Sequence, residues 1–154
     1  MAKQLFDAYP PVPNRRAWAI HAAYYSANLI LYYLQGKDFP AAQRELQRME
    51  EAMKSPKLRK KYREEAEKIF AERRMFVQVH MGNYDGAEEV YLREVREAKD
   101  LLAAVSASCL LVKIYAATGE PAKAAERYAF VRDKGGDTRY AEEARQYLAQ
   151  AIPE

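Results

Sequence analysis

Apolar residues recur along most of the chain at the three-to-four-residue spacing of an α-helix, and turns that contain Gly or Pro interrupt them. No stretch alternates apolar and polar residues as a half-buried β-strand would. The pattern therefore predicts an all-α protein of about seven helices. They are expected near residues 15–35, 40–54, 57–81, 85–98, 100–118, 121–133 and 137–151.

Three of the turns share one sequence motif, in which a Gly-containing turn leads to a small Ala and then to a large residue one helical turn later. The turns begin at Gly36, Gly82 and Gly119, and the pairs are Ala42 with Leu46, Ala87 with Tyr91, and Ala124 with Tyr128. The alanines follow one another after 45 and then 37 residues. A motif that recurs at such intervals predicts an array of helical repeats, in which the small Ala lets two helices approach closely.

In these residues the chain resembles the tetratricopeptide repeat family, whose unit has a period of 34 residues. The third unit carries the resemblance best. Leu111, Tyr115, Gly119, Ala124 and Tyr128 stand where the family places its Leu, Tyr, turn Gly, small Ala and large aromatic residue. The resemblance covers roughly residues 17–136. It implies antiparallel helical pairs stacked into a right-handed α-solenoid.

The expected organisation has three parts. Residues 1–14 contain three prolines and form an extended arm that ends at Asn14, a suitable N-cap for the first helix. Residues 15–136 contain three helical pairs, and residues 137–154 supply a capping helix that covers the end of the stack. The pairs are expected at 15–54, 57–98 and 100–134.

Composition agrees with one globular domain. The chain has 154 residues, of which 49% are hydrophobic and 31% charged, with a net charge of +3. Cys109 is the single cysteine, so a disulfide within the chain is impossible and a reducing, cytoplasmic location is expected. Residues 17–35 carry no formal charge, but polar residues such as Ser26 and Asn28 interrupt them. We expect a buried helix there and no membrane span.

No set of residues in the sequence indicates catalysis. His21 and His80 lie on different predicted helices and belong to no metal-ligand pattern, and the chain has no glycine-rich phosphate-binding loop. The carboxylates of residues 64–67 are interspersed with basic residues, which is typical of a solvated helix face. The sequence therefore predicts no enzyme activity, no metal site and no cofactor.

The resemblance also implies a binding surface, because the first helix of each pair lines the concave side in this family. An aromatic and apolar centre with a few polar groups is the usual chemistry of a recognition groove. An alternative is that the long helix near 57–81 closes the groove and buries Phe76 in the core. The implied peptide-binding residues are Tyr24, Leu31, Glu72, Phe76, His80 and Lys113.

The function expected from these features is a non-enzymatic scaffold that binds a peptide or a helix of another protein. One alternative is a self-association domain that forms a homo-oligomer through the tyrosine-rich first helix or the proline-containing arm. A weaker alternative is nucleic-acid binding through the basic run 57–63. Acidic residues follow that run closely and the net charge is small, so no nucleic acid is expected as a partner.

Overall fold

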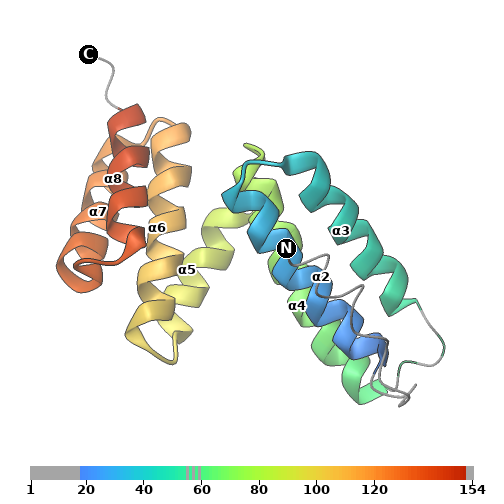
Figure 1. Cartoon of the computed structure of the whole chain (residues 1–154). Coiled ribbons are helices and arrows are strands. Elements are labelled where there is room, and N and C mark those ends of the chain that lie inside the picture. The colour runs from blue at the N-terminus through green and yellow to red at the C-terminus, as the bar shows by residue number, and fades with distance from the viewer. Residues whose placement is uncertain (1–17, 55, 57, 59, 152–154) are drawn as a thin grey trace. The chain divides into compact units, whose positions relative to one another are not determined.

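A computed structural model describes residues 18–54, 56, 58 and 60–151, and this part of the chain contains seven helices and no strand (Figure 1). The all-α prediction is therefore confirmed for these residues. The predicted arm 1–14, with the Asn14 cap, lies outside them. The helices are α2 (Trp18–Gln35), α3 (Phe39–Met53), α4 (Lys60–His80), α5 (Ala87–Glu97), α6 (Leu101–Ala117), α7 (Pro121–Gly135) and α8 (Arg139–Ala151).

Aspartate side chains cap the first turns of two helices. Asp38 Oδ1 accepts a hydrogen bond from the Ala41 amide at 3.1 Å at the start of α3. Asp100 Oδ1 accepts from the Ala103 amide at 2.8 Å at the start of α6. Each carboxylate pairs an amide that has no partner within its own helix.

One predicted end is displaced. Helix α7 continues through Gly135, two residues beyond the predicted end at Asp133. A Cβ atom on Gly135 would come within 2.9 Å of Val105 Cγ1, so the absence of a side chain lets this last turn lie against α6. The chain leaves the helix at Gly136, whose φ of 46° lies in the left-handed region that glycine tolerates best.

The chain divides into two compact units, residues 1–81 and 82–154. The division falls at the end of α4, inside the helical pair predicted for residues 57–98. Each unit is described below by itself.

In the first unit, α2 packs against both α3 and α4, which also contact each other. One apolar cluster joins Ile30 and Leu34 of α2 to Ala42 of α3 and Val77 of α4. A second cluster lies nearer the start of α2 and contains Ala23, Ala27, Met49, Leu58 and Ala66. Because successive α2 residues contact successive α4 residues, these two helices run parallel, with α3 antiparallel to both (Figure 1).

A buried carboxylate also joins α2 to α3. Glu45 is 5% exposed, and its two oxygens have different partners. The Ser26 hydroxyl donates to Oε2 at 3.3 Å, and the Arg48 guanidinium donates to Oε1 at 2.6 Å. The charge of Glu45 is thus paired and hydrogen-bonded, as a buried carboxylate must be to avoid a large desolvation cost.

In the second unit, α6 is the central helix and packs against α5, α7 and α8. Its core with α7 and α8 consists of Val105, Cys109, Val112, Val131 and Ala144. Toward α5, the Tyr115 hydroxyl donates to Glu88 Oε1 at 2.9 Å. Nine residues of α6 are buried, which is the environment expected for a helix enclosed by three neighbours.

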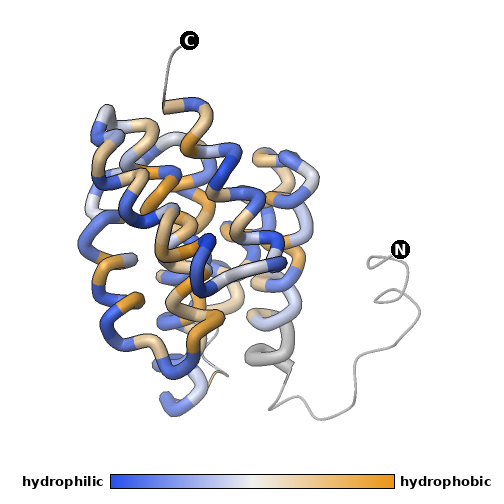
Figure 2. Tube along the Cα trace, turned by 90° about the vertical axis from the view of Figure 1, so that its left-hand side faces the viewer, coloured by the Kyte–Doolittle hydropathy of each residue, from blue (hydrophilic) through white to orange (hydrophobic). Residues whose placement is uncertain are grey.

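The repeat alanines belong to the buried interior. Ala42, Ala87 and Ala124 are all completely buried, as the spacing predicted. The large residues paired with these alanines differ in burial. Tyr91 is buried, whereas Leu46 and Tyr128 are half-buried. Figure 2 shows hydrophobic and hydrophilic residues interleaved along the helices. Every helix in the described part of the chain is too short or too polar to span a membrane.

Candidate binding surface

Five of the six predicted groove residues belong to the first unit and lie on two neighbouring parallel helices. Tyr24 and Leu31 are on α2, seven residues apart and therefore on one side of that helix. Glu72, Phe76 and His80 are on α4 at four-residue spacing, which also places them on one side. We call these five residues the α2–α4 surface.

Two contacts hold these helices side by side. The Tyr24 hydroxyl donates to Glu65 on α4, and this hydrogen bond raises the pKa of Tyr24. The Arg73 guanidinium donates from Nε to the Ala27 carbonyl oxygen at 3.2 Å. Glu65 lies seven residues before Glu72 on the same side of α4, so the Tyr24 contact falls at one end of the α2–α4 surface.

The other end of this surface is a ring pair. Phe76 and His80 have ring centroids 4.4 Å apart, and His80 Nδ1 lies 2.9 Å from the Phe76 carbonyl oxygen. Both side chains are half-buried. Phe76 packs against the cluster of Ile30, Leu34 and Val77 while keeping part of its ring accessible.

Exposure varies along the surface in a way that suits contact with a ligand. Tyr24 is 39% exposed, Glu72 is exposed, and Leu31 is half-buried. Apolar groups therefore border an acidic group within one unit. Among the described residues, no three His, Cys, Asp or Glu side chains are arranged to hold a metal ion.

Lys113, the sixth predicted groove residue, is on α6 in the second unit, and its side chain extends toward α8. Its Nζ atom is 4.5 Å from the centroid of the Tyr147 ring, a cation–π contact. Burial, followed by the nearby Cys109 and Glu143, raises the pKa of Tyr147 to about 12. Burial and then Glu143 also raise the pKa of Cys109 to about 12, although Lys113 lowers it, so this thiol remains protonated near neutral pH.

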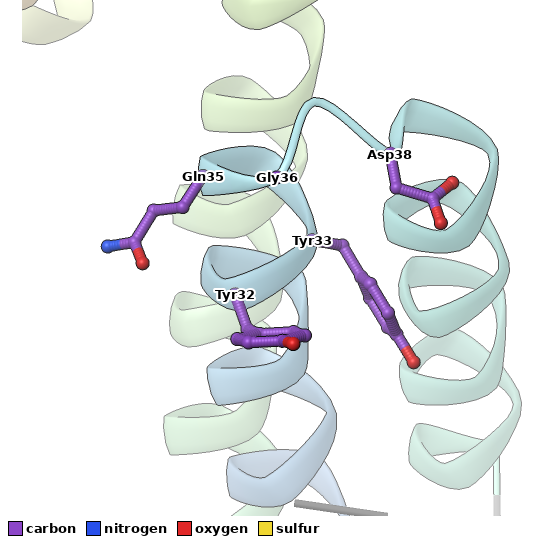
Figure 3. A pocket seen from close by; sticks show the side chains of 5 residues that line it. All are labelled: Tyr32, Tyr33, Gln35, Gly36 and Asp38. Carbon is purple, nitrogen blue, oxygen red and sulfur yellow. The ribbon is translucent and has the colours of Figure 1, made fainter. Parts of the chain in front are cut away.

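A hollow that the sequence interpretation missed lies at the end of α2. It has a volume of about 510 Å³ and is lined by Tyr32, Tyr33, Gln35, Gly36 and Asp38 (Figure 3). Tyr33 extends toward α3, whereas Gln35 points away from it (Figure 3). The two tyrosine rings meet edge to face with centroids 5.6 Å apart. The adjacent tyrosines were the available signal, but only the fold shows that Tyr32 remains 63% exposed.

One residue of the basic run 57–63 makes hydrogen bonds within the protein. Arg63 donates to the Met53 carbonyl oxygen at 3.1 Å and to the Leu58 carbonyl oxygen at 3.4 Å. These bonds tie the end of α3 to the beginning of α4. Lys60 and Lys61 remain exposed.

Comparison with models of protein families, with curated proteins and with solved structures finds no match to this chain.

Proposed function

We propose that the protein is a non-enzymatic, TPR-like module that binds a short peptide of a partner protein on the α2–α4 surface. The supporting observation is that aromatic and apolar side chains keep accessible area on two adjacent parallel helices of a unit that has its own buried core. Tyr24, Leu31 and Phe76 supply this area. Tyrosine and phenylalanine contribute large contact areas with few rotatable bonds, which favours them at recognition sites.

The charge on this surface indicates which peptide it would accept. Glu65 and Glu72 are both exposed and lie on the same side of α4 as Phe76. A peptide with an apolar side chain next to Lys or Arg would place the apolar group against Phe76 or Leu31 and the cation near these carboxylates. Complementary charge of this kind increases specificity and association rate more than it increases affinity.

A peptide library displayed on phage tests the proposal on the full chain, and the affinity of an enriched peptide is then measured by fluorescence anisotropy. Glu72→Lys should weaken binding about tenfold or more, equivalent to about 1.4 kcal/mol. Glu67→Lys is the matched control, since it makes the same charge change at an exposed position on another side of α4. Failure to enrich any peptide, or equal affinity in both variants, would contradict the proposal.

Self-association remains the second candidate, because Tyr32 on α2 is 63% exposed. Light scattering over a range of protein concentrations distinguishes the two functions. A molecular mass that rises with concentration, and returns to that of a monomer in Tyr32→Arg, would favour self-association.

A further inference from the structure

The hollow at the end of α2 brings aromatic and acidic groups together, away from the α2–α4 surface. Tyr32, Tyr33 and Asp38 line it, with Gln35 and Gly36 (Figure 3). Its volume of about 510 Å³ is within the usual range for sites that bind small molecules or single side chains. Tyr32 is 63% exposed and Asp38 is also exposed, so a ligand can reach both groups.

Contacts within the first unit fix the two aromatic walls of the hollow. Tyr33 extends toward α3 and packs against the apolar cluster that joins α2, α3 and α4, which holds its ring in place. The Tyr32 ring meets the Tyr33 ring edge to face, with an angle of 66° between their planes. The two rings therefore form adjacent walls at an angle, and Tyr32 keeps accessible area for a further contact.

The third group of the hollow is the carboxylate of Asp38. The Asp38 amide donates to the Tyr33 carbonyl oxygen at 2.9 Å, and its Oδ1 accepts from the Ala41 amide at 3.1 Å. These two bonds fix the residue in the turn next to Tyr33. Among the described residues, none donates to Oδ2 or forms an ion pair with Asp38. Lys37, its neighbour in the turn, is not among the residues that line the hollow.

These groups together favour a cation. The face of an aromatic ring attracts cations through its negative quadrupole. The hollow lies at the C-terminal end of α2, where the last carbonyl groups of a helix have no partner in the helix and create a partial negative charge. Asp38 adds a full negative charge, which exceeds the partial positive charge of about half an elementary charge at the start of α3.

Shape and hydrogen-bonding capacity favour a guanidinium group over other cations. It is planar, so it can stack on the Tyr32 ring, and its N–H groups can donate to the Asp38 carboxylate and to carbonyl oxygens at the end of α2. The ammonium group of lysine is more strongly hydrated, and a quaternary ammonium group has no donor for the carboxylate.

We propose that the hollow binds the guanidinium group of an arginine side chain in a peptide of a partner protein. This inference is independent of the proposed function, since it concerns the end of α2 next to α3 rather than the α2–α4 surface.

An NMR titration of the isotope-labelled full chain with N-acetylarginine amide tests the proposal. We expect the amide signals of Tyr32, Gly36 and Asp38 to shift and to reach saturation. N-acetyllysine amide keeps the positive charge, and N-acetylcitrulline amide keeps the planar shape without the charge. Both should bind about tenfold more weakly or less, because each lacks one of the properties on which the site depends. Equal affinity for either of them, or no saturable shift at these residues, would overturn the proposal.

Substitutions locate the site. Asp38→Asn removes the charge but keeps an N-cap of similar strength, so it should weaken arginine binding about tenfold while α3 stays folded. Asp85→Asn makes the same change at an exposed position in a turn of the second unit and should leave binding unchanged. Tyr32→Ala should also weaken binding, whereas Tyr32→Phe, which keeps the ring, should not. Binding that is lost in Glu72→Lys and retained in Asp38→Asn would place the arginine on the α2–α4 surface and contradict the proposal.

A last comparison identifies the source of the guanidinium group. Free arginine has an α-carboxylate, which Asp38 and the negative end of α2 would repel, whereas the blocked residue represents an arginine within a peptide. The blocked residue should therefore bind more tightly. Tighter binding of free arginine would indicate a small-molecule ligand and would contradict a peptide as the partner.

Discussion

Helices α2 and α6 are followed by similar arrangements of helices, but they differ in how many helices pack against them. Each is followed by an antiparallel helix and then by a parallel one (Figure 1). Each ends in a turn with a left-handed residue, Lys37 or Gly119, and an alignment at these two residues makes Tyr32 the counterpart of Ile114. Helix α6 also packs against the helix before it, and nine of its residues are buried. In the described part of the first unit α2 has only two neighbours, and Tyr32 is exposed where Ile114 is buried. The difference shows that the number of neighbours, rather than the apolar content of a helix, decides which of its residues form core.

The largest expected effect compares these two counterpart positions. Ile114→Ala should lower the free energy of unfolding by about 2–5 kcal/mol, because it leaves a cavity at a 3% exposed site. Tyr32→Ala should lower it by less than about 1 kcal/mol, as is usual at exposed positions. Urea denaturation followed by circular dichroism measures both values. Similar losses in the two variants would mean that α2 and α6 are enclosed to the same degree.

The repeat alanines offer a second comparison between the units. Ala42→Leu in the first unit and Ala124→Leu in the second should each destabilise the protein by about 1–3 kcal/mol, because both sites are fully buried and have no room for a larger side chain. Ala125→Leu is the control, since Ala125 is exposed on α7. Thermal unfolding measures the effect. An unchanged melting temperature in both buried variants would show that the helices do not meet at these alanines.

Alkaline pH should destabilise the second unit through Cys109. Its pKa is about 12 in the folded protein against an ordinary value of 9.0, so the unfolded chain loses this proton first. The stability contributed by the buried neutral thiol is therefore complete below pH 9 and decreases as pH rises toward 12, by at most about 1.4 kcal/mol per pH unit.

Denaturation with urea at several pH values measures this slope. Cys109→Ala is the control, because it removes the titrating thiol. The variant should lose stability less steeply between pH 9 and 12 than the wild type, although Tyr147 retains a contribution of the same sign. An identical pH dependence in the two proteins would contradict the assignment.

The smallest effect concerns the left-handed residue at each turn. Gly119→Lys should cost about 1 kcal/mol, because a side chain with a Cβ atom is strained at a φ of 77°. Lys37→Gly should stabilise the first unit by up to about 1 kcal/mol, since it removes this strain, although the greater freedom of glycine in the unfolded chain offsets part of the gain. Opposite signs in urea denaturation would support the alignment of the turns, and equal signs would refute it.

Much of the local structure followed from the sequence. The helical period, the caps at Asp38 and Asp100 and the buried repeat alanines depend on interactions within a few residues or on side-chain size, and these are properties of the sequence itself. The first turn is an instructive exception. Gly36 marks the end of α2, but the left-handed residue is Lys37, because the hydrogen bond from Asp38 to Tyr33 closes the turn one residue later.

The tertiary structure decided which faces are covered. Tyr32 and Tyr33 are neighbouring residues of the same type, yet Tyr33 extends toward α3 whereas the Tyr32 side chain is exposed to solvent. The same holds for Phe76, whose partly buried ring depends on contacts with residues more than 40 positions away. The sequence by itself determined where helices form and where they meet closely. Only the packing of distant segments decided which apolar side chains remain accessible, because burial depends on neighbours that a local pattern does not specify.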